Sequence, residues 1–292
     1  MMEKEYLKAR VAYNKYCINN EYVIDEKVLK YIEERIKANK EEITKMLDLC
    51  DRKIKYEEIE KIVEEEINKK SEYKKQINLK KREDNFVSCI YKTSIGVIGI
   101  EAYEIIEVIK YIIRGIKTRN AIIISDIEYK EMDDKNLIIE IVKEALRKFE
   151  IDSELIQILP YEECDYKKFD KVIYTYEIKN KKKIEKEESK KVYIYVESEE
   201  FEEIAKNEYE EIKKEREVEI IKGKIEEVIE KVNEKVYEGT IIYTNSTKKG
   251  FEYINQVRAK NVFVNTTLEY IEEIEKNNDE LLMNKKIMYE LN

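Results

Sequence analysis

The 292-residue chain contains no histidine and no tryptophan, and it has only one proline and 6 glycines. The absence of histidine excludes Ser-His and Cys-His catalytic pairs and histidine metal ligands. Any catalysis must therefore depend on cysteine, lysine, tyrosine or carboxylate side chains. The shortage of glycine matters as well, because turns that cradle phosphate groups with backbone amides depend on it.

The four cysteines, Cys17, Cys50, Cys89 and Cys164, lack the Cys-x-x-Cys spacing of zinc sites and redox motifs. The sequence therefore predicts no metal site and no disulfide framework. No run approaches the roughly 18 apolar residues that span a bilayer. The charged start, MMEKEYLKAR, lacks the apolar core of a signal peptide. We expect a cytoplasmic protein.

Charged residues make up 41% of the chain, and the net charge is −9. Such a chain is a poor ligand for nucleic acid or anionic membranes, because the phosphates of both repel it. Basic runs such as residues 179–183 are followed at once by glutamates, which cancel their field. We therefore expect no nucleic acid and no membrane as a partner.

Apolar periodicity predicts helices in the first third of the chain and alternating strands and helices afterwards. Helical spacing runs from Asp25 to Leu47 as one helix, and a second stripe runs from Ile59 to Ile67. From residue 95 onward, short runs rich in Ile and Val alternate with helical stretches, which is typical of a buried parallel sheet and an α/β fold. The runs are IGVIGI (95–100), NAIIIS (120–125), LIQIL (155–159), KVIYTY (171–176), VYIYV (192–196), EVEII (217–221), TIIYT (240–244) and NVFVN (261–265).

Two sheets are expected from these runs. IGVIGI, NAIIIS and KVIYTY should be parallel strands of one sheet, and VYIYV and NVFVN should belong to a second, smaller sheet. A charged stretch at 180–191, nearly free of apolar residues, marks the boundary. The prediction is N-terminal helices with a parallel-sheet lobe over residues 1–185, and a smaller second α/β lobe over residues 186–292.

The succession GVIGIEAYE, a helix, and RGIKTRNAIIIS resembles the aldehyde dehydrogenase superfamily. Within it, the resemblance is closest to the glutamate-5-semialdehyde dehydrogenases, also called gamma-glutamyl phosphate reductases. Gly96, Gly99 and Asn120 match that family's GVIG and Gly-Asn-Ala segments, and Asn265 matches an asparagine of unknown role at the end of a later strand. The segments KKVYIYVES and LLMNKKIMYEL are similar to later parts of the family. The resemblance implies a Rossmann-like lobe for NADP, a second lobe with a cysteine nucleophile, proline biosynthesis as the pathway, and an oligomer.

The chain departs from that family where the cofactor would bind. The glycine-rich turn after NAIIIS is replaced by Ser125, Asp126, Ile127 and Glu128. The carboxylates would repel the cofactor's phosphates, and Ile127 denies the close backbone approach that glycine permits. A second glycine-rich turn is replaced by residues 175–178. The vestigial cofactor-binding candidates are Gly96, Gly99, Asn120, Ser125 and Asp126, and NADP is expected only if the chain is active.

The chain also departs from the family at the nucleophile. The family's cysteine lies just before the strand that VYIYV resembles, where this chain has Lys190 and Lys191, with Ser189 as the nearest hydroxyl. No histidine exists to activate that serine. Cys164 is flanked by three carboxylates in YEECDY, which raise the pKa of its thiol, and Cys89 lies in the apolar run FVSCIY. No residue is therefore assigned as catalytic, and the segment 197–217 is shorter than in the family.

Two functions from different classes follow. The first is a catalytically degenerate aldehyde-dehydrogenase-like pseudoenzyme, retained as a scaffold or regulator in a homo-oligomer or with a protein partner. The alternative is an active but diverged NADP-dependent glutamate-5-semialdehyde dehydrogenase, an oxidoreductase with its nucleophile in an unexpected place. A binding module for another small ligand remains a third interpretation, because open α/β sheets hold ligands at their strand ends.

Overall fold

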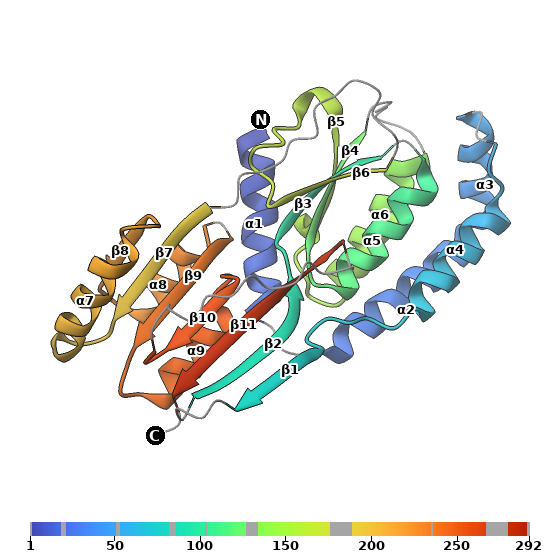
Figure 1. The fold of residues 1–292 in the computed structure, drawn as a ribbon. Coiled ribbons are helices and arrows are strands. Elements are labelled where there is room, and N and C mark those ends of the chain that lie inside the picture. Colours follow the sequence, from blue (N-terminus) through green and yellow to red (C-terminus); the bar gives the residue numbers. More distant parts are fainter. Residues whose placement is uncertain are drawn as a thin grey trace. The chain divides into compact units, whose positions relative to one another are not determined.

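The structure is a computed structural model, and it describes residues 2–18, 22–50, 53–81, 86–102, 104–126, 134–175, 189–234, 236–266 and 280–290. Contacts divide the chain into two compact units. Unit 1 consists of Met1–Ser71 and Gly96–Lys186, and unit 2 consists of Glu72–Ile95 and Glu187–Asn292. Each unit contains a sheet with helices packed on it (Figure 1).

The sheet of unit 1 is formed by β3 (Val97–Ala102), β4 (Ala121–Asp126), β5 (Ile156–Pro160) and β6 (Lys171–Tyr174). The order is β5-β4-β3-β6, and each neighbouring pair is parallel. Every residue of β3 and β4 is buried, which accounts for their near-continuous apolar sequence. The prediction that IGVIGI, NAIIIS and KVIYTY share one parallel sheet is confirmed.

Unit 1 also contains α1 (Met2–Ile18), α2 (Tyr22–Ala38), α3 (Lys40–Leu49), α4 (Tyr56–Asn68), α5 (Ile105–Lys117), α6 (Asp134–Lys148) and the 3-10 turn η1 (Ser153–Leu155). The single helix predicted from Asp25 to Leu47 is wrong, because the structure has a break at Asn39 between α2 and α3. The Asn39 side chain donates to the carbonyl of Arg35 at 2.7 Å, and such local hydrogen bonds compete with a continuing helix. Asp25 lies inside the first turn of α2 rather than before it.

Different helices pack on the two faces of this sheet. Gly115 of α5 packs on Ile122 of β4, and α6 lies on the same side. On the opposite face, α1 lies beside Phe169, because the ring centroid of Tyr6 in α1 is 6.3 Å from that of Phe169. Figure 1 shows α1 on one side of these strands and α5 with α6 on the other.

The connection from β5 to β6 passes β4 and β3 and consists of residues 161–170. It contains the 3-10 turn η2 (Tyr161–Glu163) but no α-helix, whereas parallel strands are usually joined by one. Phe169 of this connection lies directly over Gly99, where an added Cβ would be 2.3 Å from its Cδ2 atom. The glycine in the middle of β3 therefore makes room for an aromatic ring.

The sheet of unit 2 is formed by β1 (Gln76–Lys81), β2 (Phe86–Ser94), β7 (Ser189–Val196), β8 (Val218–Ile221), β9 (Tyr237–Tyr243), β10 (Asn261–Val264) and β11 (Leu282–Glu290). Its order is β1-β2-β11-β10-β9-β7-β8. The strands from β11 to β8 are parallel neighbours, and β1 and β2 add antiparallel pairs.

The expectation that this second sheet is the smaller one is wrong. Among the described residues it has seven strands, against four in unit 1. The physical reason is the long antiparallel ladder between β2 and β11, which runs from Leu282 opposite Ser94 to Glu290 opposite Phe86. This ladder places residues 72–95 in unit 2, whereas the sequence assigned them to the lobe of residues 1–185.

Three helices, α7 (Glu202–Ile212), α8 (Ile225–Val232) and α9 (Thr247–Gln256), follow strands of this sheet, and the 3-10 turn η3 (Glu199–Phe201) precedes α7. The segment 197–217, which the sequence marked as shortened, thus holds η3 and α7. One apolar cluster joins α8 and α9 to one sheet face, and a second joins α7 to the other. Within the part of the chain that the structure describes, no helix is long and apolar enough to cross a membrane.

Candidate functional site

The candidate site is the carboxyl edge of the parallel sheet in unit 1. In open parallel sheets, ligands bind outside this edge, at the point where the strand order reverses. Here the order reverses at β3, because β4 and β5 follow on one side and β6 lies on the other. The last residues of these strands and the segments that follow them therefore decide what the edge can bind.

Three residues form a polar row across this edge. Glu101 of β3 is in register with Ser125 of β4 and with Tyr174 of β6, so the three side chains share one sheet face. Ser125 is fully buried, and Glu101 is 1% exposed. Thr175 donates from its backbone N–H and from its Oγ1 to the Glu101 carbonyl, each at 3.2 Å. Glu101, Ser125 and Tyr174 are called the polar row below.

Two side chains of the 161–170 connection bond to the polar row. The Tyr166 hydroxyl lies 2.7 Å from Ser125 Oγ and is also hydrogen-bonded to the Glu101 carboxylate. The Cys164 thiol is hydrogen-bonded to Ser125, and its Sγ lies 3.6 Å from the carbonyl oxygen of Pro160. Carboxylate, hydroxyl, phenol and thiol thus meet at the ends of β3 and β4.

The Cys164 thiol is a weak nucleophile at neutral pH. Burial, with a smaller contribution from the nearby Glu101 carboxylate, raises its pKa to about 11, although the hydrogen bond with Ser125 lowers it. Only the thiolate attacks carbonyl or thioester carbon, and this pKa leaves very little of it. The sequence predicted the direction of this shift from the flanking carboxylates, and the structure attributes most of it to burial.

Asp126 lies on the opposite face of β4, and its charge is compensated. Its Oδ1 atom is 2.5 Å from Nζ of Lys135 in α6, and both side chains are fully buried. The expectation that Asp126 is an uncompensated charge is wrong, because Lys135 neutralises it. Ile127 and Glu128, the other residues of that turn, lie outside the described residues.

Gly96 and Asn120 lie at the amino ends of β3 and β4, a full strand away from Ser125. The Gly96 N–H donates to Asn120 Oδ1 at 2.8 Å, and the Asn120 Nδ2 donates to Thr118 Oγ1 at 2.8 Å. Gly96 has a φ of 137°, a conformation that favours glycine. The two residues thus tie the starts of two strands together. The structure does not bring them, or the centrally placed Gly99, to the edge that holds Ser125 and Asp126.

The position expected for the nucleophile lies in β7 of unit 2. Lys191 Nζ is 3.1 Å from Glu217 Oε1 and 2.9 Å from Glu219 Oε2. These hydrogen bonds raise the pKa of Lys191 above its usual range, so its amine stays protonated and is no nucleophile. Ser189 and Lys190 begin the same strand. This part of the chain is a strand paired with its neighbours rather than an exposed active-site loop.

The other cysteines lie on other elements. Cys89 is 4% exposed in the apolar cluster of unit 2, and burial raises the pKa of its thiol, in agreement with the sequence analysis. Cys17 lies near the end of α1, and Cys50 directly follows α3. Among the described residues, no cluster of three or more cysteine and carboxylate side chains could hold a metal ion.

Asn265 has a structural role that the sequence left open. It directly follows β10 and adopts a left-handed φ of 53°. Its Oδ1 accepts from the Thr244 N–H and its Nδ2 donates to the Thr244 carbonyl, both at 2.9 Å. Asn265 therefore continues the pairing of β9 and β10 through its side chain.

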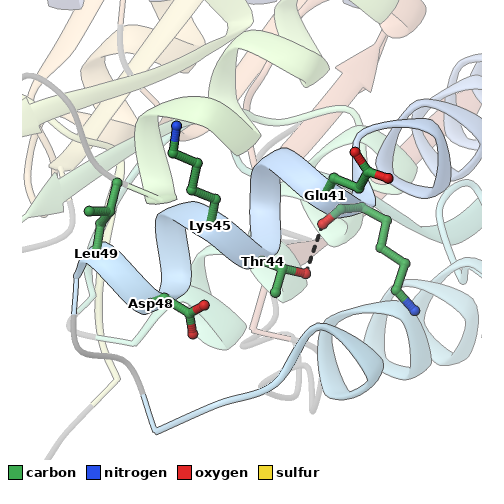
Figure 2. Close-up of a pocket in the computed structure, with 6 residues that line it drawn as sticks. Glu41, Thr44, Lys45, Asp48 and Leu49 are labelled. Carbon is green, nitrogen blue, oxygen red and sulfur yellow. Dashed lines mark hydrogen bonds between the residues drawn. The ribbon is translucent and has the colours of Figure 1, made fainter.

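A hollow of about 650 Å³ lies on the outer face of α3. Figure 2 shows that its lining comes from this one helix, with side chains that splay apart rather than converge. The Thr44 hydroxyl donates back to the Lys40 carbonyl at 2.8 Å. The lining residues are Lys40, Glu41, Thr44, Lys45, Asp48 and Leu49. Such a surface provides no convergent polar groups for a ligand.

No protein-family model and no curated protein sequence matches the chain. Solved structures do resemble it over nearly the whole length. A gamma-glutamyl phosphate reductase from Thermotoga maritima has a TM-score of 0.53 at 16% identity, covering 98% of each chain. The corresponding enzyme from Saccharomyces cerevisiae has a TM-score of 0.53 at 10% identity, covering 99% of this chain and 97% of its own.

An indole-3-acetaldehyde dehydrogenase is similar as well, with a TM-score of 0.50 at 10% identity, covering 99% of this chain and 87% of its own. At these identities the likeness concerns the fold. The chain therefore has the aldehyde dehydrogenase fold, as the resemblance in sequence predicted, and gamma-glutamyl phosphate reductases are among its structural neighbours.

Proposed function

We propose that the chain is a catalytically degenerate protein of the aldehyde dehydrogenase fold that acts as a scaffold or regulator. One observation carries the proposal. The family that the sequence resembles has its cysteine nucleophile at a place that is part of β7 in this chain. Lys191 at this place forms ion pairs with Glu217 and Glu219. Thioester chemistry requires a thiolate at that place, and Cys164 and Cys89 are both held in the thiol form.

The carboxyl edge of unit 1 supports the same proposal. Ser125 and Asp126 are fully buried, and their side chains are bonded to Tyr166 and Lys135. A cofactor pyrophosphate is normally held by free backbone amides and glycine at such an edge. In this chain the side chains at the edge are bonded to other residues of the same unit instead, so we expect no NADP binding.

The test is a titration of the full chain with NADPH in which binding is detected by thermal unfolding. A ligand at about 100 times its dissociation constant adds about 2.7 kcal/mol of stability, so even modest binding is visible. We expect no shift and no reduction of NADP with glutamate-5-semialdehyde and phosphate. Micromolar binding with turnover would refute the degenerate function.

The second candidate is a diverged NADP-dependent glutamate-5-semialdehyde dehydrogenase of proline biosynthesis. The observation in its favour is the retained strand order, which keeps the reversal point at β3. Under this candidate, Cys164 is the thiol nearest to that edge. Turnover that disappears in Cys164→Ser and persists in Cys50→Ser would establish it.

The scaffold role includes association, with either a second copy or another protein. Sedimentation equilibrium of the pure 35.3 kDa chain separates the two. A mass that is a multiple of the chain supports a homo-oligomer, because most soluble oligomers are built from identical copies. A monomer at every concentration points instead to a separate protein partner.

A further inference from the structure

The connection between β5 and β6 covers the polar row without being a regular element. From Tyr161 to Lys168 its backbone hydrogen bonds are local, such as Cys164 N–H to Tyr161 O at 3.1 Å and Lys168 N–H to Asp165 O at 3.0 Å. Its far end is anchored, because the Asp170 N–H donates to the Val97 carbonyl at 2.8 Å and Phe169 lies over Gly99. Residues 161–168 are called the strap below.

Tyr166 is the residue of the strap that connects it to the strands of the edge. Its hydroxyl bonds to Ser125 on β4 and Glu101 on β3. Its ring centroid lies 6.4 Å from that of Tyr174, at the end of β6. One side chain thereby contacts residues near the carboxyl ends of three neighbouring strands, across the point where the strand order reverses.

We propose that the strap is a closed lid over the reversal point of the sheet, and that the Tyr166 hydroxyl is its latch. Opening the strap uncovers Glu101 and Ser125, which Tyr166 and its neighbours otherwise cover, and carries Cys164, a half-buried residue of the strap, into solvent. The inference does not depend on whether the chain is an enzyme, because the lid controls access to the edge for any small molecule.

The contacts make such opening a local event. Local openings cost less free energy than global unfolding where buried apolar contacts are few and hydrogen bonds are local. The strap has a fixed end at Phe169 and Asp170, and the contacts of its other residues include turn hydrogen bonds, ring contacts of Tyr166 with its neighbours, and the latch. The groups it uncovers are polar and regain hydrogen bonds to water, which further lowers the cost.

Cys164 serves as the reporter for opening. In a background with Cys17, Cys50 and Cys89 changed to serine, the rate of alkylation by iodoacetamide measures access to this one thiol. The latch variant Tyr166→Phe removes the hydroxyl and keeps the ring, and Ser125→Ala removes the partner on β4. The matched control is Tyr161→Phe, which makes the same chemical change on a ring 6.0 Å from Tyr166.

A second readout is needed, because both latch variants change the surroundings of the thiol, and with a pKa of about 11 its full ionisation requires a strongly alkaline solution. Hydrogen exchange of the backbone amides of residues 162–168 reports the same opening and does not depend on the pKa of the thiol. We expect Tyr166→Phe and Ser125→Ala each to raise both the alkylation rate and the exchange rate by about three- to tenfold, the size expected for one hydrogen bond. The increase in the double variant should be smaller than the product of the two single increases, because the two residues share one bond.

Three results would overturn the lid. They are unchanged rates in both latch variants, equal increases in Tyr161→Phe, and faster alkylation without faster hydrogen exchange of residues 162–168. Circular dichroism identifies a variant that does not fold, and the remaining latch variant then decides the question, since each removes the same hydrogen bond.

Discussion

Asp126 and Lys135 neutralise each other inside unit 1, with Nζ 2.5 Å from Oδ1 and neither side chain exposed. Loss of one partner leaves the other as a buried, uncompensated charge. We predict that Lys135→Met lowers the free energy of unfolding by about 3–5 kcal/mol in urea denaturation. The double variant Asp126→Leu with Lys135→Met should recover most of this loss, and a loss below about 1 kcal/mol in the single variant would contradict the ion pair's role.

The glycine at the centre of β3 gives a prediction about packing. Gly99→Ala places a methyl group against the ring of Phe169, so the ring or the strand must move. We expect a loss of about 1–3 kcal/mol in the free energy of unfolding. Combining it with Phe169→Leu should restore part of the loss, and strictly additive losses would show that the two residues do not touch.

Asn265 allows backbone strain to be separated from hydrogen bonding. Asn265→Gly loses the two bonds to Thr244 but accepts the left-handed φ, whereas Asn265→Ala loses the bonds and strains the backbone as well. We expect alanine to be less stable than glycine by about 1 kcal/mol in thermal or urea unfolding. Equal stability of the two variants would contradict the left-handed conformation.

Glu66 of α4 gives a prediction about pH. Burial raises the pKa of Glu66, but hydrogen bonds from Arg114 and Lys69 outweigh it and lower the pKa from 4.5 to about 2. A carboxyl group with a lowered pKa stabilises the fold above its unfolded pKa and loses this effect as the pH falls through its folded pKa. Glu66→Gln should therefore be less stable than the wild type at neutral pH, and the difference should shrink between about pH 4.5 and 2.

The control for this pH series is Glu65→Gln on the same helix. Glu65 lies beside Lys61 at 3.8 Å with 47% of its side chain exposed, so its removal should change the stability by less than about 0.5 kcal/mol. A difference between Glu66→Gln and the wild type that stays constant down to pH 2 would contradict the lowered pKa.

The strands that alternate with helices were predictable from the sequence, because a strand buried on both faces is a short apolar run. NAIIIS shows this, and the structure places it as the fully buried strand β4. β11 was missed as a strand, since LMNKKIMYE interrupts its apolar residues with two lysines. Lys285 is nevertheless buried, and its ammonium donates to the Val257 carbonyl at 2.6 Å, just after α9. Only tertiary contacts show that such a lysine belongs inside a sheet.

The residues of the candidate site were partly predictable. Ser125 ended the predicted strand, but Asp126 was assigned to the following turn and instead ends β4, with its side chain on the opposite face from that of Ser125. Their partners Tyr166 and Lys135 lie on other elements. Tyr166 carried no signal, because a tyrosine among lysines and carboxylates is common in this chain. Gly96 and Asn120 precede β3 and β4, whereas Ser125 lies near the other end of β4, because the motif that grouped these residues spans a whole strand.

The pairing of β2 with β11 has a consequence for synthesis on the ribosome. β2 is made early, yet its ladder from Phe86 to Ser94 is completed only by residues 282–290, after every other described strand has emerged. The strands of unit 1 can meet once residue 174 is available, whereas the β1–β2 hairpin must wait with an open edge. Unpaired edges of this kind recruit other strands, so the nascent chain should be most prone to aggregation, and most dependent on chaperones, during this interval.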